Sequence, residues 1–161
     1  MCDPHKPSHV SHITNHASRI IFHIVSPAVC CCRMSSMSNR VAVLVDDMFF
    51  AAKINSAALS CGRRIERVKS REQLEALAAT PPSLVIIDLN SDRIDPLEAI
   101  ESLKSRSELS AVPVISFVSH VQTDLIRRAQ AAGCDYVLPR SAFNQMINEI
   151  VAGEFSALSK K

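Results

Sequence analysis

The sequence predicts one α/β domain in which a doubly wound parallel sheet is covered by helices on both faces. From Arg40 onward, short apolar runs alternate five times with segments of helical spacing, which is typical of βαβ units with right-handed crossovers. The runs 41–45, 84–87 and 112–118 are rich in Val and Ile, as expected of strands buried on both faces. A chain of 161 residues is long enough to bury a single core.

The predicted strands are short runs rich in β-branched residues, which favour extended backbone. The first run ends in Asp46-Asp47 and the third ends in Asp88, so polar residues mark the points where the chain leaves the sheet. The five predicted strands are 41–45, 64–68, 84–87, 112–118 and 136–138.

The predicted helices carry local start and stop signals. Gly62 and Gly133 follow two of them, as glycine does at helix C-termini. Ser70 and Gln73 have the spacing of a capping box, and Pro96 suits a first helical turn. The five predicted helices are 49–60, 70–79, 96–106, 122–132 and 141–151.

Residues 1–37 differ from the rest of the chain and predict a separate segment. Four histidines there follow helical spacing, and with the local cysteines they would suit zinc or copper. Pro7 disturbs that helix, so we favour a disordered leader or a start codon assigned too far upstream. We expect the domain over 38–153 and a frayed tail over 154–161. The histidines are His5, His9, His12 and His16.

Composition excludes several classes of function. The apolar fraction is 47% and the charged fraction 21%, which is ordinary for a globular protein. The net charge of +2 resides in residues 1–37, so the domain has no basic stripe and we expect no nucleic-acid partner. No apolar stretch is long enough for a membrane span. Only Cys61 and Cys134 fall in the domain, which favours a reducing, cytoplasmic compartment.

Three carboxylates are predicted at the edge of the sheet where such folds bind ligands, beyond the carboxyl ends of the strands. Asp46, Asp47 and Asp88 would repel one another there, and a hard cation such as Mg²⁺ would offset the repulsion. An aspartate can also accept a phosphoryl group. The alternative is that these residues only solvate loops or cap helices.

Four motifs, in order, resemble the response-regulator receiver domain of two-component signalling, and the resemblance covers about residues 38–152. It implies a (βα)₅ flavodoxin-like three-layer sandwich with strand order 2-1-3-4-5. The motifs are Val-Leu-Val-Asp46-Asp47, Leu-Val-Ile-Ile-Asp88-Leu-Asn90, Val112-Pro113-Val114-Ile115 and Ala131-Ala132-Gly133-Cys134-Asp135-Tyr136.

The resemblance also implies roles for individual residues. Asp88 would accept phosphate from a sensor histidine kinase or a phosphotransfer protein. Tyr136 matches an aromatic residue that changes rotamer on activation. A downstream protein would bind the face made by the fourth helix, fifth strand and fifth helix. The implied Mg²⁺ ligands are Asp46, Asp47, Asp88 and the backbone carbonyl of Asn90.

The sequence departs from the family pattern at its switch positions. Receivers usually carry Thr or Ser at the end of strand four, where Val118 stands here and Ser119 follows one place later. Strand five usually ends in Lys-Pro, and the matching residues are Pro139 and Arg140. Arg140 would reach the site only if the turn is shifted by one residue.

We therefore expect a stand-alone receiver in a phosphorelay, not an enzyme, because the chain after Val151 has no room for an output domain. One alternative is a degenerate pseudo-receiver that binds proteins without phosphorylation. A second alternative is a Mg²⁺-dependent aspartyl phosphotransferase. The second acid of such a nucleophile motif is absent, since Leu89-Asn90 follows Asp88.

Overall fold

The computed structural model describes residues 38–119, 122–156 and 158, which form a doubly wound α/β domain. Its sheet has five strands in the order β2-β1-β3-β4-β5, and all neighbouring strands run parallel. The fold class and strand order predicted from the sequence are thus confirmed. The strands are β1 (Arg40–Leu44), β2 (Arg64–Arg67), β3 (Leu84–Asp88), β4 (Val114–Val118) and β5 (Tyr136–Pro139).

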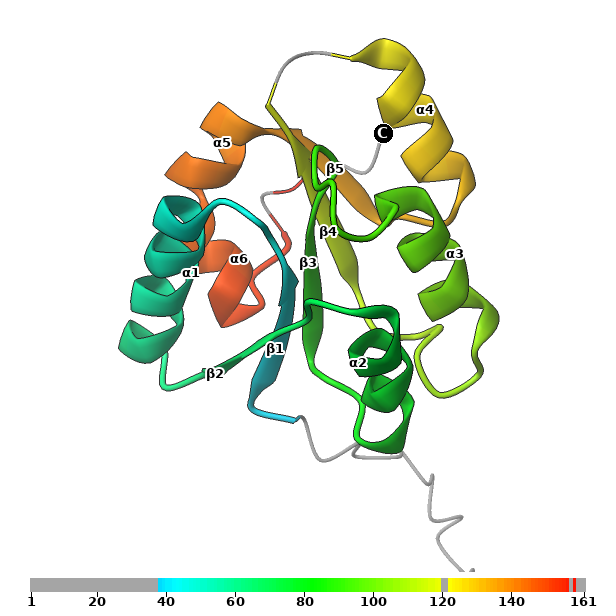
Figure 1. Cartoon of the computed structure of the whole chain (residues 1–161). Coiled ribbons are helices and arrows are strands. Elements are labelled where there is room, and N and C mark those ends of the chain that lie inside the picture. Colours follow the sequence, from blue (N-terminus) through cyan, green and yellow to red (C-terminus); the bar gives the residue numbers. More distant parts are fainter. Residues whose placement is uncertain (1–37, 120–121, 157, 159–161) are drawn as a thin grey trace, which may run out of the picture. The chain divides into compact units, whose positions relative to one another are not determined.

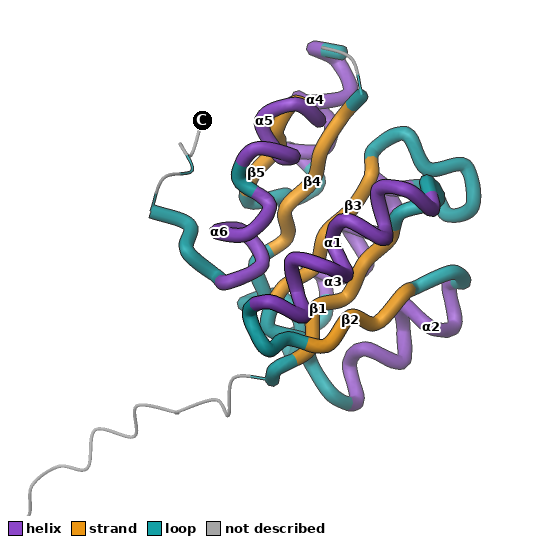
Figure 2. Tube along the Cα trace, turned by 90° about the vertical axis from the view of Figure 1, so that its left-hand side faces the viewer, coloured by secondary structure: helices purple, strands orange, loops and turns teal. Residues whose placement is uncertain are grey.

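Helices cover both faces of the sheet and make a three-layer sandwich (Figure 1). One layer contains α1, α5 and α6, and the other contains α2, α3 and α4. Figure 2 shows α1 crossing in front of the sheet. The helices are α1 (Met48–Ser60), α2 (Arg71–Ala76), α3 (Pro96–Ser105), α4 (Thr123–Ala131), α5 (Arg140–Gln145) and α6 (Ile147–Ala152), with a 3₁₀ turn at Leu77–Ala79.

The last predicted helix and the fourth predicted strand differ from the structure. The helix over 141–151 is two helices, because the backbone at Met146 leaves the helical region with φ −105° and ψ 16°. The strand over 112–118 begins at Val114. Val112 instead donates its N–H to Leu109 in a turn, and Pro113 has no N–H to offer a neighbouring strand.

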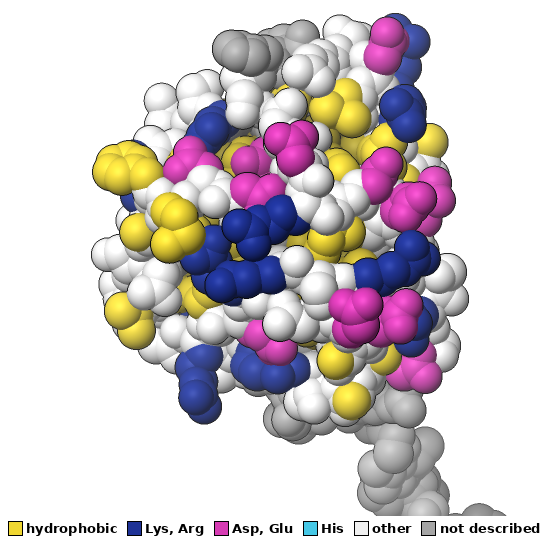
Figure 3. Space-filling view, in the orientation of Figure 1, with side chains coloured by type: hydrophobic (Ala, Val, Ile, Leu, Met, Phe, Trp, Pro, Cys, Tyr) yellow, Lys and Arg dark blue, Asp and Glu magenta, His cyan; other side chains and the backbone are white. Residues whose placement is uncertain are grey.

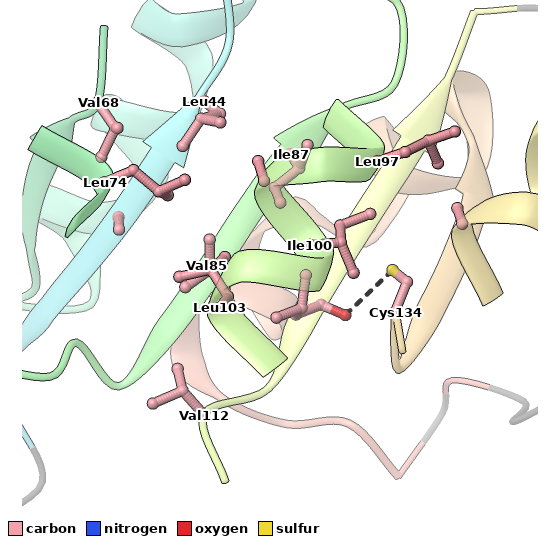
Figure 4. Close-up of a cluster of buried hydrophobic side chains, with 14 of the residues drawn as sticks. Leu44, Val68, Leu74, Val85, Ile87, Leu97, Ile100, Leu103, Val112 and Cys134 are labelled. Carbon is pink, nitrogen blue, oxygen red and sulfur yellow. Dashed lines mark hydrogen bonds between the residues drawn. The ribbon is translucent and has the colours of Figure 1, made fainter. Parts of the chain in front are cut away.

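A large apolar cluster lies between β3 and α3. Ile100 and Leu103 of α3 face Val85 and Ile87 of β3 (Figure 4). At the border of this cluster the Cys134 thiol lies 3.0 Å from the buried Ser116 hydroxyl. The packing of α3 on β3 fixes the position of the C-terminal end of β3, and therefore the position of Asp88.

The opposite face of the sheet is fixed by three aromatic rings. Phe50 of α1, Phe117 of β4 and Phe143 of α5 are buried together, with ring centroids 4.8–5.7 Å apart. Such tilted pairs stabilise beyond the area they bury. The structure also packs Phe155 and Leu158 against this cluster, so the core continues past the predicted domain end at residue 153.

Two predictions lie outside the described residues. The leader at residues 1–37 and its histidine metal site stay predictions. In the part of the chain that is described, no helix combines the length and apolar character that crossing a membrane requires.

Candidate functional site

Asp88 is the last residue of the central strand β3, and the residue is almost fully buried, with 5% of its surface exposed. Its Oδ1 accepts a hydrogen bond of 3.0 Å from the backbone N–H of Asn90. Burial raises the pKa of Asp88 above its ordinary value, and the charges of Asp46 and Asp47 add to this rise. The Asn90 N–H and the positive charge of Arg140 oppose it.

Asp47 caps the first helix and also binds an arginine. Its Oδ1 accepts hydrogen bonds from the N–H groups of Phe49 at 2.9 Å and Phe50 at 3.1 Å, as an N-cap side chain does. Its Oδ2 pairs with the guanidinium of Arg140. The Phe50 N–H and Arg140 together hold the pKa of Asp47 below its ordinary value.

Arg140 lies directly after β5, which ends at Pro139, one residue further than predicted. Arg140 then opens α5, and its guanidinium carbon lies 4.5 Å from the centroid of the Phe50 ring. A guanidinium over an aromatic face is held by a cation–π interaction. The guanidinium of Arg140, from the first residue of α5, thus lies beside Asp47, and its positive charge also acts on Asp88.

Asp46 holds the loop that connects β3 to α3. Its Oδ2 accepts hydrogen bonds from the Ser91 hydroxyl at 2.7 Å and the Asp92 N–H at 3.1 Å. Its Oδ1 lies 2.8 Å from Nε of Arg93. Three consecutive loop residues thus bind one carboxylate, which fixes the loop over the end of β1.

Asn90 joins the ends of β3 and β4. Its N–H donates to Asp88, and its side-chain Oδ1 accepts a hydrogen bond of 2.8 Å from the backbone N–H of Ser119. The sequence predicted a role for the Asn90 carbonyl but gave no sign of this side-chain bond. Ser119 therefore lies near the site through its backbone.

Val118 and Tyr136 do not join the polar site. Val118 ends β4 with its side chain buried in the apolar cluster against β3 and α3. Tyr136 begins β5 beside Ile115 of β4, and its ring lies 6.1 Å from that of Phe155. Since Leu138 is level with Phe117, the register places Tyr136 two residues below the edge where Asp88 ends β3.

Two arginines offset much of the negative charge at this edge. Asp46 and Asp47 each have both carboxylate oxygens bonded to donors of the chain, with Arg93 on one and Arg140 on the other. Figure 3 shows positive and negative side chains interleaved on the side of the domain that Figure 1 presents.

The donor atoms at this edge are oxygens, which suit Mg²⁺, but the side chains that carry them are not arranged as a metal site. Among the residues that the structure describes, no group of three His, Cys, Asp or Glu side chains is placed to hold a metal. A cation at Asp46 and Asp88 would have to replace the guanidinium of Arg93. That residue was missed at the sequence level, where a basic residue in the loop after Asp88 was the available signal.

The sequence matches no protein-family model and no curated protein, but the fold matches many solved structures. The phosphorylated cyanobacterial phytochrome response regulator is 21% identical with a TM-score of 0.61, over 74% of this chain and 96% of that chain. A chemotaxis response regulator of Vibrio cholerae is 14% identical with a TM-score of 0.63, over 73% and 98%.

A third similar structure is the receiver domain of a sensor histidine kinase from Pseudomonas aeruginosa, with a magnesium ion coordinated in its active-site cleft. It is 17% identical with a TM-score of 0.59, over 71% of this chain and 97% of that chain. The domain described here thus has the fold of response-regulator receiver domains.

The substitution Asp88→Asn is expected to stabilise the domain at pH 7. A carboxylate whose pKa is raised by folding binds more protons in the folded state than in the unfolded state. The free energy of unfolding therefore falls as the pH rises from the ordinary aspartate pKa through the raised pKa of folded Asp88. Removing the charge removes this loss. Urea unfolding should show a higher midpoint for Asp88→Asn at pH 7 than for wild type, with a smaller difference below the ordinary aspartate pKa of about 3.9.

The matched control is Asp124→Asn on the exposed surface of α4, which should leave the unfolding midpoint nearly unchanged. A lower midpoint for Asp88→Asn at pH 7 would contradict the assignment of Asp88 as a carboxylate destabilised by burial.

Proposed function

We propose that this chain is a receiver-type signalling domain of a cytoplasmic phosphorelay in which Asp88 accepts a phosphoryl group from a phosphohistidine. The observation that carries the proposal is the state of Asp88. It ends the central strand, one of its oxygens is fixed by the Asn90 N–H, and burial disfavours its charged form. A carboxylate held in one orientation at the ligand edge of the sheet suits nucleophilic attack.

The proposed step transfers one phosphoryl group and needs no redox partner. An oxygen of Asp88 attacks the phosphorus of the phosphohistidine, the P–N bond breaks, and the imidazole leaves and takes up a proton. The product is an aspartyl phosphate. Arg140, the first residue of α5, whose positive charge acts on Asp88, would offset the charge of the phosphoryl oxygens.

A divalent cation at Asp46, Asp88 and the Asn90 carbonyl would neutralise charge on the transferred group. Within the chain, Asp46 would exchange its bond to Arg93 for that cation, whereas Asp47 would keep both its helix cap and Arg140. We propose Mg²⁺ for this role, since the donors are all oxygens.

The proposed output is docking rather than turnover. Asp88 would act as an acceptor, and the signal would pass to a downstream protein through the face formed by α4, β5 and α5. Arg127 and Arg128 are exposed on α4. The donor would be a sensor histidine kinase or a phosphotransfer protein.

Phosphorylation by a small-molecule donor tests the proposal. Incubation with acetyl phosphate and Mg²⁺ should add one phosphoryl group to the wild-type domain, seen by intact mass spectrometry, and none to Asp88→Asn. The control Asp124→Asn lies on α4 and should behave as wild type. A phosphoryl group that persists in Asp88→Asn, or a wild type that never gains one, would exclude Asp88 as acceptor.

A phosphorylation-independent binding module is the second candidate, and one observation favours it. Arg93 already forms an ion pair with Asp46, and Arg140 forms one with Asp47. The edge of the sheet is thereby held without a cation or a phosphoryl group, and the domain could present its docking face in that state alone.

The substitution Arg93→Gln separates the two candidates. The ion pair is half exposed, with side-chain exposures of 58% for Arg93 and 32% for Asp46, so it contributes at most about 1 kcal/mol. Arg93→Gln should therefore tighten Mg²⁺ binding by up to about fivefold, measured from amide NMR shifts near Asp46. Arg127→Gln on α4 should leave the binding unchanged. The absence of any Mg²⁺ response in all three proteins would favour the binding module.

A further inference from the structure

We infer that Asn90 is a positioning residue that couples the carboxylate of Asp88 to the segment following β4. Its N–H donates to Oδ1 of Asp88 at 3.0 Å, and its side-chain Oδ1 accepts from the N–H of Ser119 at 2.8 Å. One residue is therefore bonded to the proposed phosphoacceptor and to the chain that leads toward α4. The inference deepens the proposed function and rests on it for the chemical event at Asp88.

The position of this link in the sheet makes it the last connection between the two strands. β3 and β4 pair up to Asp88 and Phe117, and the Leu89 N–H then donates to the Phe117 carbonyl at 2.9 Å. Beyond that point the backbone ladder stops, and the Asn90 side chain continues it. The apolar side chain of Val118 can make no hydrogen bond there. The group of the β4 side that takes part is the Ser119 N–H, which donates to Oδ1 of Asn90.

The rest of the loop leaves Asn90 little freedom to adjust elsewhere. The Ser91 N–H donates to the Asp88 carbonyl at 3.1 Å, and Asp46 binds Ser91 and Asp92. At the far end, Asp95 caps α3. When the bond between Asp88 and Asn90 changes, the neighbouring loop residues are held in place, so it is Asn90 that changes position.

Attachment of a phosphoryl group changes that bond by simple chemistry. When the other oxygen of Asp88 is phosphorylated, Oδ1 becomes a neutral carbonyl oxygen and its bond from Asn90 loses the assistance of charge. Charge-assisted hydrogen bonds are roughly twice as strong as neutral ones. The hold of Asp88 on Asn90 weakens, and the bond from Asn90 to Ser119 changes with it.

The start of α4 is well suited to respond. Within the described residues, its N-cap Gln122 makes no side-chain cap bond, whereas Asp47 and Asp95 cap α1 and α3. The first turn of α4 therefore lacks the side-chain cap that α1, α2 and α3 have.

Amide NMR on four proteins tests the coupling without any phosphorylation. They are wild type, Asp88→Asn, Asn90→Ala and the double variant. Asp88→Asn removes the negative charge from the carbonyl group that Asn90 binds, as phosphorylation of the other oxygen would. Asp88→Asn should shift the Ser119 amide resonance when Asn90 is present and leave it in place in the Asn90→Ala background. Asn90→Ala alone should speed exchange of the Ser119 amide about fivefold, as expected for losing one hydrogen bond.

Two further variants guard the interpretation. Asn90→Asp keeps an acceptor oxygen and should preserve slow exchange at Ser119, and Asn55→Ala on the exposed side of α1 should change neither readout. An equal shift of Ser119 in both backgrounds, or no shift in either, would overturn the inference. If acetyl phosphate fails to modify Asp88 while the coupling is present, the proposed phosphorylation fails and the role of Asn90 stands.

Discussion

The repulsion among three carboxylates is the constraint on which this site depends. Asp46, Asp47 and Asp88 meet at the end of an apolar sheet, where like charges are costly. The chain offsets two of them with guanidinium groups, Arg93 on Asp46 and Arg140 on Asp47. Asp88 is left buried, with a raised pKa. Arg93 belongs to the β3–α3 loop and Arg140 opens α5, so the two ion pairs tie both segments to the residues that follow β1.

The packed core places these groups at one edge. The aromatic cluster of Phe50, Phe117 and Phe143 joins α1, β4 and α5, and Phe50 also supports Arg140. On the opposite face, α3 packs on β3 and fixes where Asp88 emerges. The same apolar contacts that stabilise the sheet therefore orient the polar residues at its edge. A substitution in either helical layer should change the positions of those residues.

The sequence predicted the sheet and the three carboxylates because both depend on local pattern. Continuous apolar runs indicate buried parallel strands, and the residues that end them must meet at one edge. The partners of the carboxylates could not be predicted. Arg140 and Asp47 are 93 positions apart in the sequence, and the Asn90 bond to Ser119 joins residues 29 positions apart. The break at Met146 has no proline or glycine to announce it.

The central claim is that Arg93 and Arg140 neutralise Asp46 and Asp47. Asp88 is then the carboxylate that is available for chemistry. A carbon-13 NMR titration of the aspartate carboxyl groups in the wild-type domain tests it most directly. The account predicts that Asp47 ionises below the ordinary aspartate pKa and that Asp88 ionises above it. An Asp88 that ionises at or below the ordinary value, together with an unshifted Asp47, would contradict it.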